Sequence, residues 1–308
     1  MLKIKIIAIL TLILTGCGGG GGGSSSNGGG GTIPTVAFTS WSAVQPNTEI
    51  VAPAISTETT YTENLSETIT SVGNFTTFSG IEFRETFGAD GTVTKGSLTT
   101  GDGDRLVFDK AAGATFTPIV NGFATVAFNA NETAFAIVVE PIPQGWNYQT
   151  FGVWQRSPSQ GNPGRVGAIS TGSFTAANNI PSTGSATFTG VSAGVYLPSV
   201  GSYSGLVAAD MRMNVNFSSR TSTFGTTNTS LSTNGGQSFT SVSFLNLTGN
   251  LQITGGQNLM SGTVTTASNL SGDIYGKFYG PSAQEVGGTF GLKGSGVETY
   301  VGGFGGKR

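Results

Sequence analysis

The most regular pattern in this sequence is an alternation of apolar and polar residues in its C-terminal half. Between residues 210 and 217, methionine, valine and phenylalanine alternate with arginine and asparagine. Residues 245–254 set leucine and isoleucine opposite asparagine, threonine and glutamine in the same way. A period of two places the apolar side chains on one face of a β-strand. Both segments are therefore predicted to be strands with one face on a core and the other in water.

Other segments from residue 146 onward carry weaker strand signals. They lie at 147–155, 183–190, 261–267, 272–280, 285–293 and 298–305, which makes eight strands with the two above. Glycine is frequent in the last three, although it weakens a flat strand. Small closed barrels use such glycines at bends and at points of tight packing. Residues 146–308 are therefore predicted to form an eight-stranded antiparallel β-barrel filled by side chains.

The N-terminal half shows shorter strand signals, and no long segment has helical spacing. Residues 134–139 are continuously apolar, as in a strand that is buried on both faces. Two prolines and a glycine in residues 140–145 favour a domain boundary there. We therefore predict an all-β protein, with a β-rich domain at 34–145 before the barrel. The candidate strands of that domain are 75–78, 81–87, 105–108, 123–128 and 134–139.

The first residues are typical of a secretion signal. Lys3 and Lys5 precede a short apolar run, which is far below the roughly 20 residues of a membrane span. The run ends in LTGC, which resembles the lipobox of bacterial lipoproteins. This resemblance implies cleavage after residue 16 and lipid attachment at Cys17. Two or more acyl chains give firm membrane anchoring, whereas one gives only marginal binding.

Residues 17–33 are predicted to be a lipidated cysteine followed by a flexible tether. The tract after Cys17 reads GGGGGGSSSNGGGG and cannot bury apolar surface. Cys17 is also the only cysteine of the chain, so no internal disulfide can form. Gly18, rather than an aspartate, follows it, which resembles Gram-negative lipoproteins that are forwarded to the outer membrane. The expected localisation is thus the outer membrane, by a lipid anchor.

Composition excludes several kinds of chemistry. The chain has no histidine, which excludes Ser-His-Asp catalysis, Cys-His catalysis and histidine metal sites. Its acidic residues are scattered and form no recognisable catalytic pair. Without Lys3 and Lys5 the net charge is −4, from 12 basic and 16 acidic residues, and no basic cluster favours nucleic acid. The protein is therefore predicted not to be an enzyme.

One C-terminal segment carries a family likeness. Residues 276–290, GKFYGPSAQEVGGTF, resemble the G-x-F-Y-G-P-x-A-x-E-x-G-G-x-F signature of transferrin-binding-protein-B-like lipoproteins. Residues 181–190 resemble a hairpin of that family's barrel, residues 148–154 resemble its first strand, and residues 303–307 resemble its last. The likeness covers roughly 146–308. It implies a barrel of this type, with residues 34–145 as the domain that the family calls a handle.

The resemblance also implies a function. Members are displayed on the cell surface, usually through a dedicated translocon, and bind host or nutrient cargo such as transferrin, haem or haemoglobin. This chain has room for one lobe, whereas the full transferrin receptors have two. The leading hypothesis is therefore a non-catalytic surface lipoprotein that binds a host protein, a nutrient carrier or haem. A structural or adhesive envelope lipoprotein remains the alternative function. A barrel that itself spans the membrane also remains open.

The candidate ligand-binding residues lie in a predicted loop between two strands, 195–204. Tyr196, Leu197 and Tyr203 are candidates for exposed contacts there, since loops carry binding residues and tyrosine is favoured at interfaces. The alternative is that the tyrosines fold down and cap the barrel. Trp41 and Tyr61 are weaker candidates in the N-terminal domain.

Two further patterns suggest a metal or haem, but simpler interpretations are favoured. Asp102, Asp104 and Asp109 in GDGDRLVFD lack the remaining ligands of a calcium loop, so a β-turn is predicted. Methionine can ligate haem iron, but Met211 and Met213 are predicted to lie in the core of the barrel. We therefore predict neither a metal site nor a bound cofactor.

Overall fold

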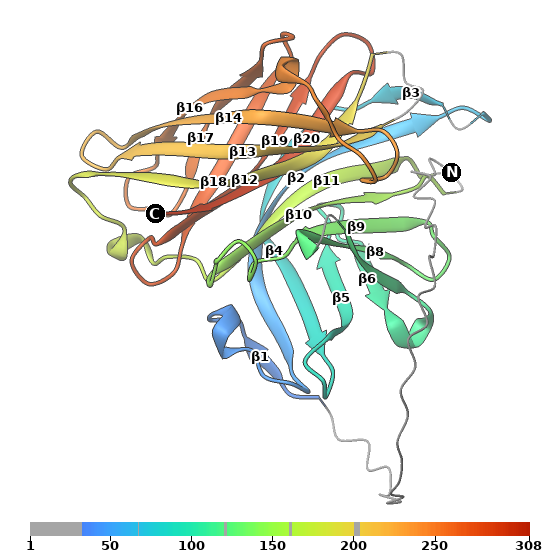
Figure 1. Ribbon diagram of the computed structural model, residues 1–308, viewed down its shortest axis with the longest axis horizontal. Coiled ribbons are helices and arrows are strands. Elements are labelled where there is room, and N and C mark those ends of the chain that lie inside the picture. The colour runs from blue at the N-terminus through green and yellow to red at the C-terminus, as the bar shows by residue number, and fades with distance from the viewer. Residues whose placement is uncertain (1–32, 67, 120–121, 160–161, 200–203) are drawn as a thin grey trace, which may run out of the picture.

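The computed structural model describes residues 33–66, 68–119, 122–159, 162–199 and 204–308. In this part of the chain regular structure is almost entirely β-strand, and helix is confined to short 3-10 turns. The strands form two sheets stacked one on the other (Figure 1). No helix in these residues is long and apolar enough to cross a membrane. The predicted all-β fold class is confirmed.

The first sheet, called the handle sheet below, contains the strands up to β11. Its order is β6-β5-β4-β2-β11-β10-β9-β8-β7, and β1 and β3 pair with β2 beside this path. The bounds are β1 Thr35–Ala37, β2 Glu49–Glu63, β3 Ile69–Val72, β4 Thr76–Phe87, β5 Val93–Thr99, β6 Arg105–Asp109, β7 Thr115–Ile119, β8 Ala124–Phe128, β9 Ala134–Val139, β10 Gln149–Arg156 and β11 Gly164–Gly172. The predicted strands of this region are confirmed, and 75–78 and 81–87 join in β4.

The second sheet closes into a barrel. Its order is β13-β12-β20-β19-β18-β17-β16-β14, and a further pairing of β13 with β14 closes the ring, with the short β15 beside β14. The bounds are β12 Ser185–Leu197, β13 Gly205–Asn216, β14 Thr221–Ser232, β15 Thr240–Ser241, β16 Leu247–Ile253, β17 Met260–Thr266, β18 Ser271–Tyr279, β19 Glu285–Lys293 and β20 Thr299–Lys307. All neighbours in the ring are antiparallel. The predicted eight-stranded antiparallel barrel is confirmed.

The barrel differs from the prediction in one of its eight strands. The segment 147–155 forms β10, but β10 pairs with β9 and β11 in the handle sheet, so its assignment to the barrel is wrong. The missing strand is β14, whose inward positions are mostly small and polar: Ser222, Thr226, Thr229 and Ser232 are buried beside Phe224. Alternating hydrophobicity therefore does not reveal it. The chain passes from one sheet to the other between β11 and β12.

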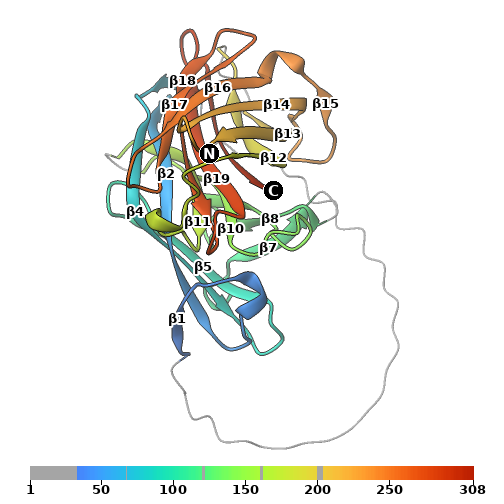
Figure 2. The same ribbon diagram turned by 90° about the vertical axis from the view of Figure 1, so that its left-hand side faces the viewer.

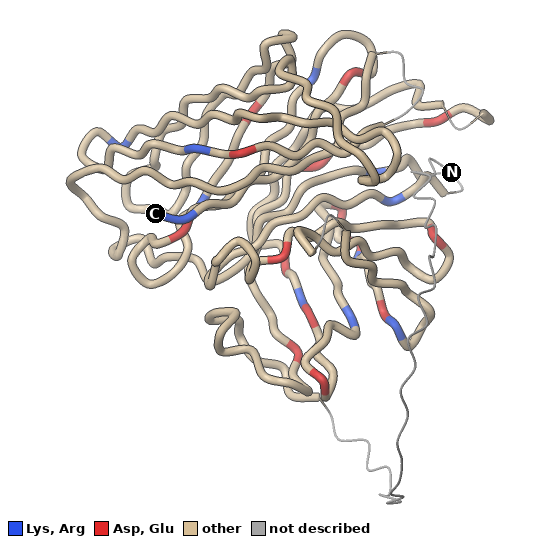
Figure 3. The backbone as a smooth tube through the Cα atoms, viewed as in Figure 1, with Lys and Arg blue, Asp and Glu red and all other residues tan. Residues whose placement is uncertain are grey.

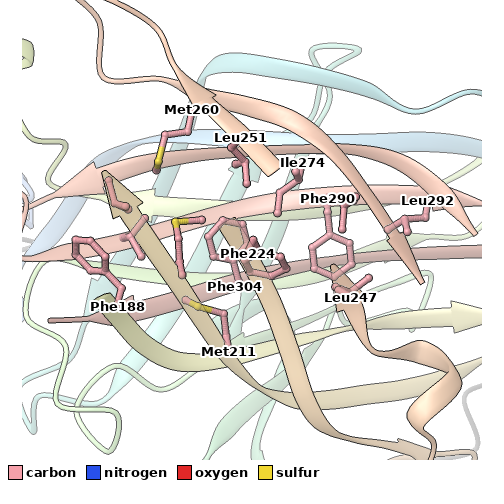
Figure 4. Close-up of a cluster of buried hydrophobic side chains, with 14 of the residues drawn as sticks. Phe188, Met211, Phe224, Leu247, Leu251, Met260, Ile274, Phe290, Leu292 and Phe304 are labelled. Carbon is pink, nitrogen blue, oxygen red and sulfur yellow. The ribbon is translucent and has the colours of Figure 1, made fainter. Parts of the chain in front are cut away.

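Apolar side chains fill the barrel. Met211, Met213 and Val215 on β13 point inward and are almost fully buried, as their alternation predicts. Figure 4 shows Phe188, Phe224, Phe290 and Phe304 gathered in the same interior, from strands all around the ring. The centres of the Phe224 and Phe304 rings lie 4.8 Å apart. The interior is thus a packed core.

The glycines of β19 and β20 serve the packing of the two sheets. Each of these strands is buried on both of its faces: one face packs on the barrel core, and the opposite face packs on the handle sheet. A methyl group on Gly303 would lie 2.6 Å from Phe151 Cδ2 on β10, and one on Gly305 would lie 2.4 Å from Gln149 Nε2. Their glycines therefore allow β10 to approach the barrel wall closely. Figure 2 shows β10 and β11 against β19.

The signature hairpin also belongs to this contact. The Glu285 carboxylate accepts hydrogen bonds from the backbone N–H groups of Asn147 (2.6 Å) and Tyr148 (2.9 Å), just before β10. The Tyr279 hydroxyl is 2.7 Å from the Ser170 hydroxyl on β11. Burial raises the pKa of Glu285, although these backbone donors oppose the rise. The motif therefore joins the barrel to the handle sheet as well as forming a turn.

Candidate binding cleft

The handle sheet curls without closing. Its path ends at β6 and at β7, and these strands do not pair in the described part of the chain. A cleft of about 680 Å³ lies inside the curl, lined from β4 and β5 on one side and β7 to β10 on the other. This size lies within the range of roughly 300–1,000 Å³ that is usual for ligand pockets. The open sheet is the reason that a space remains here.

Aromatic and apolar side chains form most of the wall. Trp41, Phe87 and Phe116 line the cleft with several valine and proline side chains. The turn η1 (Trp41–Ala43) is fixed to the start of β10, because Trp41 Nε1 donates to the Gln149 carbonyl (3.0 Å) and its backbone N–H donates to the Asn147 carbonyl (2.8 Å). The indole ring therefore has a fixed position in the wall.

Two carboxylates share this apolar cleft. Glu85 on β4 and Glu140 at the end of β9 both line it. The Thr125 hydroxyl donates to Glu140 Oε1 at 2.6 Å. Burial, and next the negative charge of Glu140, raise the pKa of Glu85 to about 8. At neutral pH Glu85 therefore keeps its proton, and it lies close enough to the carboxylate of Glu140 for that negative charge to raise its pKa.

The rim of the cleft carries an exposed apolar side chain and a cation. Ile142 is 67% exposed, although most large aliphatic side chains of the described residues are buried. The Lys110 ammonium, from the turn η2 (Lys110–Ala112), lies 5.3 Å from the centre of the Phe116 ring. Apolar anchors with few polar groups are what a protein or small-molecule ligand needs for binding.

The aspartates of the GDGD segment form ion pairs. Asp102 Oδ2 lies 3.1 Å from Arg165 Nη2 and 3.2 Å from Arg156 Nη2, and Asp104 also pairs with Arg156. The buried Glu58 carboxylate joins the cluster at 3.1 Å from Arg165 Nη1. These charges link the turn before β6 to β2, β10 and β11.

No group of three acidic or cysteine residues in the described ranges is arranged to hold a metal ion. Asp109 instead accepts a hydrogen bond from the Ala111 N–H (2.9 Å) and pairs with Lys95 (3.0 Å). Figure 3 shows charged residues of both signs along the handle strands β4 to β6. The GDGD segment is therefore a turn held by arginines.

The structure buries the two candidate ligand-binding residues that it describes, Tyr196 and Leu197. Tyr196 and Leu197 lie in the last two positions of β12 and are only 8% and 5% exposed. The Tyr196 hydroxyl donates to Glu298 Oε1 at 2.7 Å. Neither residue is an exposed contact, because the strand continues to Leu197. The other interpretation holds for Tyr196, whose ring folds down into the barrel core. Tyr203 lies outside the described residues, and a role of the three in binding stays a prediction.

The two weaker candidates also differ. Trp41 lines the cleft, whereas Tyr61 is 3% exposed and its hydroxyl accepts a hydrogen bond from Gln155 Nε2 at 2.7 Å. The cleft residues that sequence reasoning missed are Glu85, Phe87, Phe116 and Glu140. Their strands are short or irregular, and only the curl of the sheet brings them together. Cys17 lies outside the described residues, so its lipidation stays a prediction.

Comparisons with known proteins agree with the barrel. Residues 180–308 match the family described as C-lobe and N-lobe beta barrels of Tf-binding protein B. Among solved structures, a mutant of transferrin binding protein B from Haemophilus parasuis Hp5 is 12% identical, with 90% of this chain and 78% of that chain covered and a TM-score of 0.44. The protein of the same name from serogroup B Neisseria meningitidis is 18% identical, with 76% and 53% covered and a TM-score of 0.40.

A third similar structure is the N-lobe domain of lactoferrin binding protein B from Moraxella bovis. It is 12% identical, with 82% of this chain and 98% of that chain covered and a TM-score of 0.36. No curated protein matches the sequence.

Proposed function

We propose that this chain is a lipid-anchored surface receptor, on the premise that the barrel match at residues 180–308 makes it a member of the transferrin-binding protein B family. In this proposal the protein stands on the outer membrane, binds a host protein, a nutrient-carrier protein or haem, and catalyses no reaction. The translocon of surface lipoproteins would carry it there. The observation that supports ligand binding best is the cleft in the handle sheet.

The chemistry of the cleft favours a protein ligand with basic and apolar side chains. The Glu140 carboxylate would attract a lysine or arginine, whose charge would favour the ionised form of the nearby Glu85. Trp41, Phe87 and Phe116 would pack against the aliphatic stem of that side chain. Desolvated apolar anchors supply most of the binding energy at protein interfaces. Ile142 at the rim would contact the same ligand, since it is exposed beside the opening.

A binding titration with the variant Ile142→Lys tests the cleft. Immobilised iron-loaded transferrin, lactoferrin and haemoglobin, and haemin in solution, are the probes. We expect one of the protein probes to bind the unaltered chain, and Ile142→Lys to weaken that binding at least about tenfold, because it removes an apolar anchor and places a positive charge against a basic ligand. Ile142 is exposed, so the melting temperature should stay the same.

The matched control is Leu65→Lys, which makes the same kind of change at an exposed residue beyond the end of β2. Its affinity should equal that of the unaltered chain. Loss of binding in the control alone would move the site to the β2–β3 hairpin. Failure of every probe to bind would favour a structural or adhesive role instead.

The anchor has a separate test. The variant Cys17→Ser removes the sulfur that would be acylated, so we expect the protein to move from the detergent phase to the aqueous phase on detergent phase partitioning. The unaltered chain is the control. Continued recovery of Cys17→Ser in the detergent phase would mean that another part of the chain enters the lipid.

A further inference from the structure

A second cavity lies between the handle sheet and the barrel. Its volume is about 290 Å³, and its walls come mainly from β8, β9 and β10 on one side and from β12 and β13 on the other. The described residues that line it have apolar side chains, apart from glycines and the hydroxyl of Ser230. It shares strands β7 to β10 with the cleft but lies against their opposite face, because the two sets of lining residues alternate along these strands. The cleft contains two carboxylates, and this cavity contains none.

The backbone of these walls offers few partners to a polar ligand. Gly152 and Val153 pair with Val138 and Ile137 in the β9–β10 ladder, and Ala193 pairs with Ala208 in the β12–β13 ladder. A buried water molecule needs two to four polar partners. One hydroxyl does not supply them. The cavity is therefore suited to hydrocarbon and poorly suited to water.

Small residues keep this space open. Five lining positions are alanine or glycine: Ala124, Gly152, Ala193, Gly194 and Ala208. The β13–β14 ladder is also irregular here, with a register shift between Ala208 and Asp210 that lies opposite Ser230. Protein interiors are normally close-packed, and an unfilled apolar space destabilises the fold. A site that keeps such a space is explained most simply by an apolar occupant.

The cavity has an entrance at the side where β7 and the β14–β15 turn meet. The lining residues Ile119, Phe123, Ser230 and Phe239 are only partly buried, in contrast to the fully covered Val153. A methyl group on Gly236, in that turn, would lie 3.8 Å from Leu206 and 3.9 Å from Ile119. A polar head group could thus remain in water near Ser230 while an apolar tail occupies the space behind.

We propose that this cavity between the two sheets binds the alkyl chain of a fatty acid or a lipid. Its volume is about twice that of the ~150 Å³ apolar cavities that bind benzene. Such a chain fits walls without charge and with one hydroxyl near the entrance. This site is separate from the cleft, so it is independent of the proposed receptor function.

A fluorescence titration with cis-parinaric acid tests the proposal. The full chain carrying Cys17→Ser is used, so that no acyl chain on that sulfur competes. We expect one saturable site, and at least tenfold weaker binding in Ala208→Met, which fills the cavity from β13. Ala193→Met fills it from β12 and serves if the first variant fails to fold. The matched control is Thr187→Met, which adds the same side chain at an exposed position of β12 and should bind unchanged.

Displacement distinguishes the sources of the alkyl chain. Dodecanoate in solution would displace the probe if free fatty acid enters the site, whereas displacement only by phosphatidylglycerol vesicles would identify a lipid. Bound fatty acid should also raise the melting temperature of the Thr187→Met control but not that of Ala208→Met. Absence of saturable binding, or equal binding to the filled variant and the control, would overturn the proposal.

Discussion

The barrel and the handle sheet are both curled antiparallel sheets, but only the barrel closes. The pairing of β13 with β14 completes its ring, and large side chains such as Phe278, Phe290 and Phe304 fill the interior with essentially no exposure. The handle sheet ends at β6 and β7 without such a pairing among the described residues. One part of its interior is an apolar core, and another part is the cleft that contains Glu85 and Glu140.

This difference indicates which part of the molecule can accept substitutions without losing its fold. A closed ring fixes every strand by two neighbours, so its interior is needed for stability and tolerates little change. An open sheet can keep polar groups and unfilled space at its edges. Under the proposed receptor function, the barrel would therefore act as the support, and the handle sheet would be the part in which recognition residues can vary.

The largest expected effect comes from removing a phenyl side chain from the interior of each sheet. Phe290→Ala should lower the free energy of unfolding by about 3–5 kcal/mol, because Phe290 is fully buried in the barrel. Phe116→Ala makes the same change at the partly buried wall of the cleft and should cost roughly 1 kcal/mol or less. Urea unfolding of both variants measures this. Equal losses would contradict the contrast between a closed and an open interior.

The contact between the sheets gives an intermediate effect. Gly303→Ala should lower stability by about 1–3 kcal/mol, because its methyl group would meet the Phe151 ring of β10. Gly225→Ala on β14 is the control, since the nearest atom to its methyl group would be the Leu247 carbonyl oxygen at 3.7 Å. Urea midpoints should show no loss in the control. An unchanged urea midpoint for Gly303→Ala would mean that the two sheets can move apart enough to accommodate the methyl group.

The smallest expected effect concerns pH and the cleft. The pKa of Glu85 is raised from 4.5 to about 8 in the folded protein, so the folded state keeps a proton that the unfolded chain has released. Stability should therefore fall as the pH rises through this window. Because Glu85 is partly exposed, we expect a loss of only about 1 kcal/mol or somewhat more. Glu85→Gln should remove the slope.

Thermal or urea unfolding between about pH 5 and pH 9 measures that slope. The exposed Glu132 provides the control, because Glu132→Gln should leave the pH dependence as it is in the unaltered chain. If Glu85→Gln retains the full slope, another group in the protein is responsible.

The sequence predicted the barrel better than the cleft, for reasons visible in particular strands. β13 and β16 alternate large apolar with polar residues, because each has one face on the core and one in water. β14 fills its inward positions with Ser222, Thr226 and Thr229, so it shows no such contrast. The residues of the cleft come from six strands and four turns or loops that are distant in the chain, and no local pattern connects them.

By itself the sequence determined the strands that alternate apolar and polar residues, such as β13 and β16, and which of their faces are apolar, since a period of two is a local property of the chain. The tertiary structure alone decided that β10 joins β9 and β11, although its sequence suits the barrel equally well. It also decided that Tyr196 is buried, and that Glu85 lies near Glu140. The reason is that strands pair through backbone groups that every residue has in common, so the choice of neighbour depends on the packing of the whole chain.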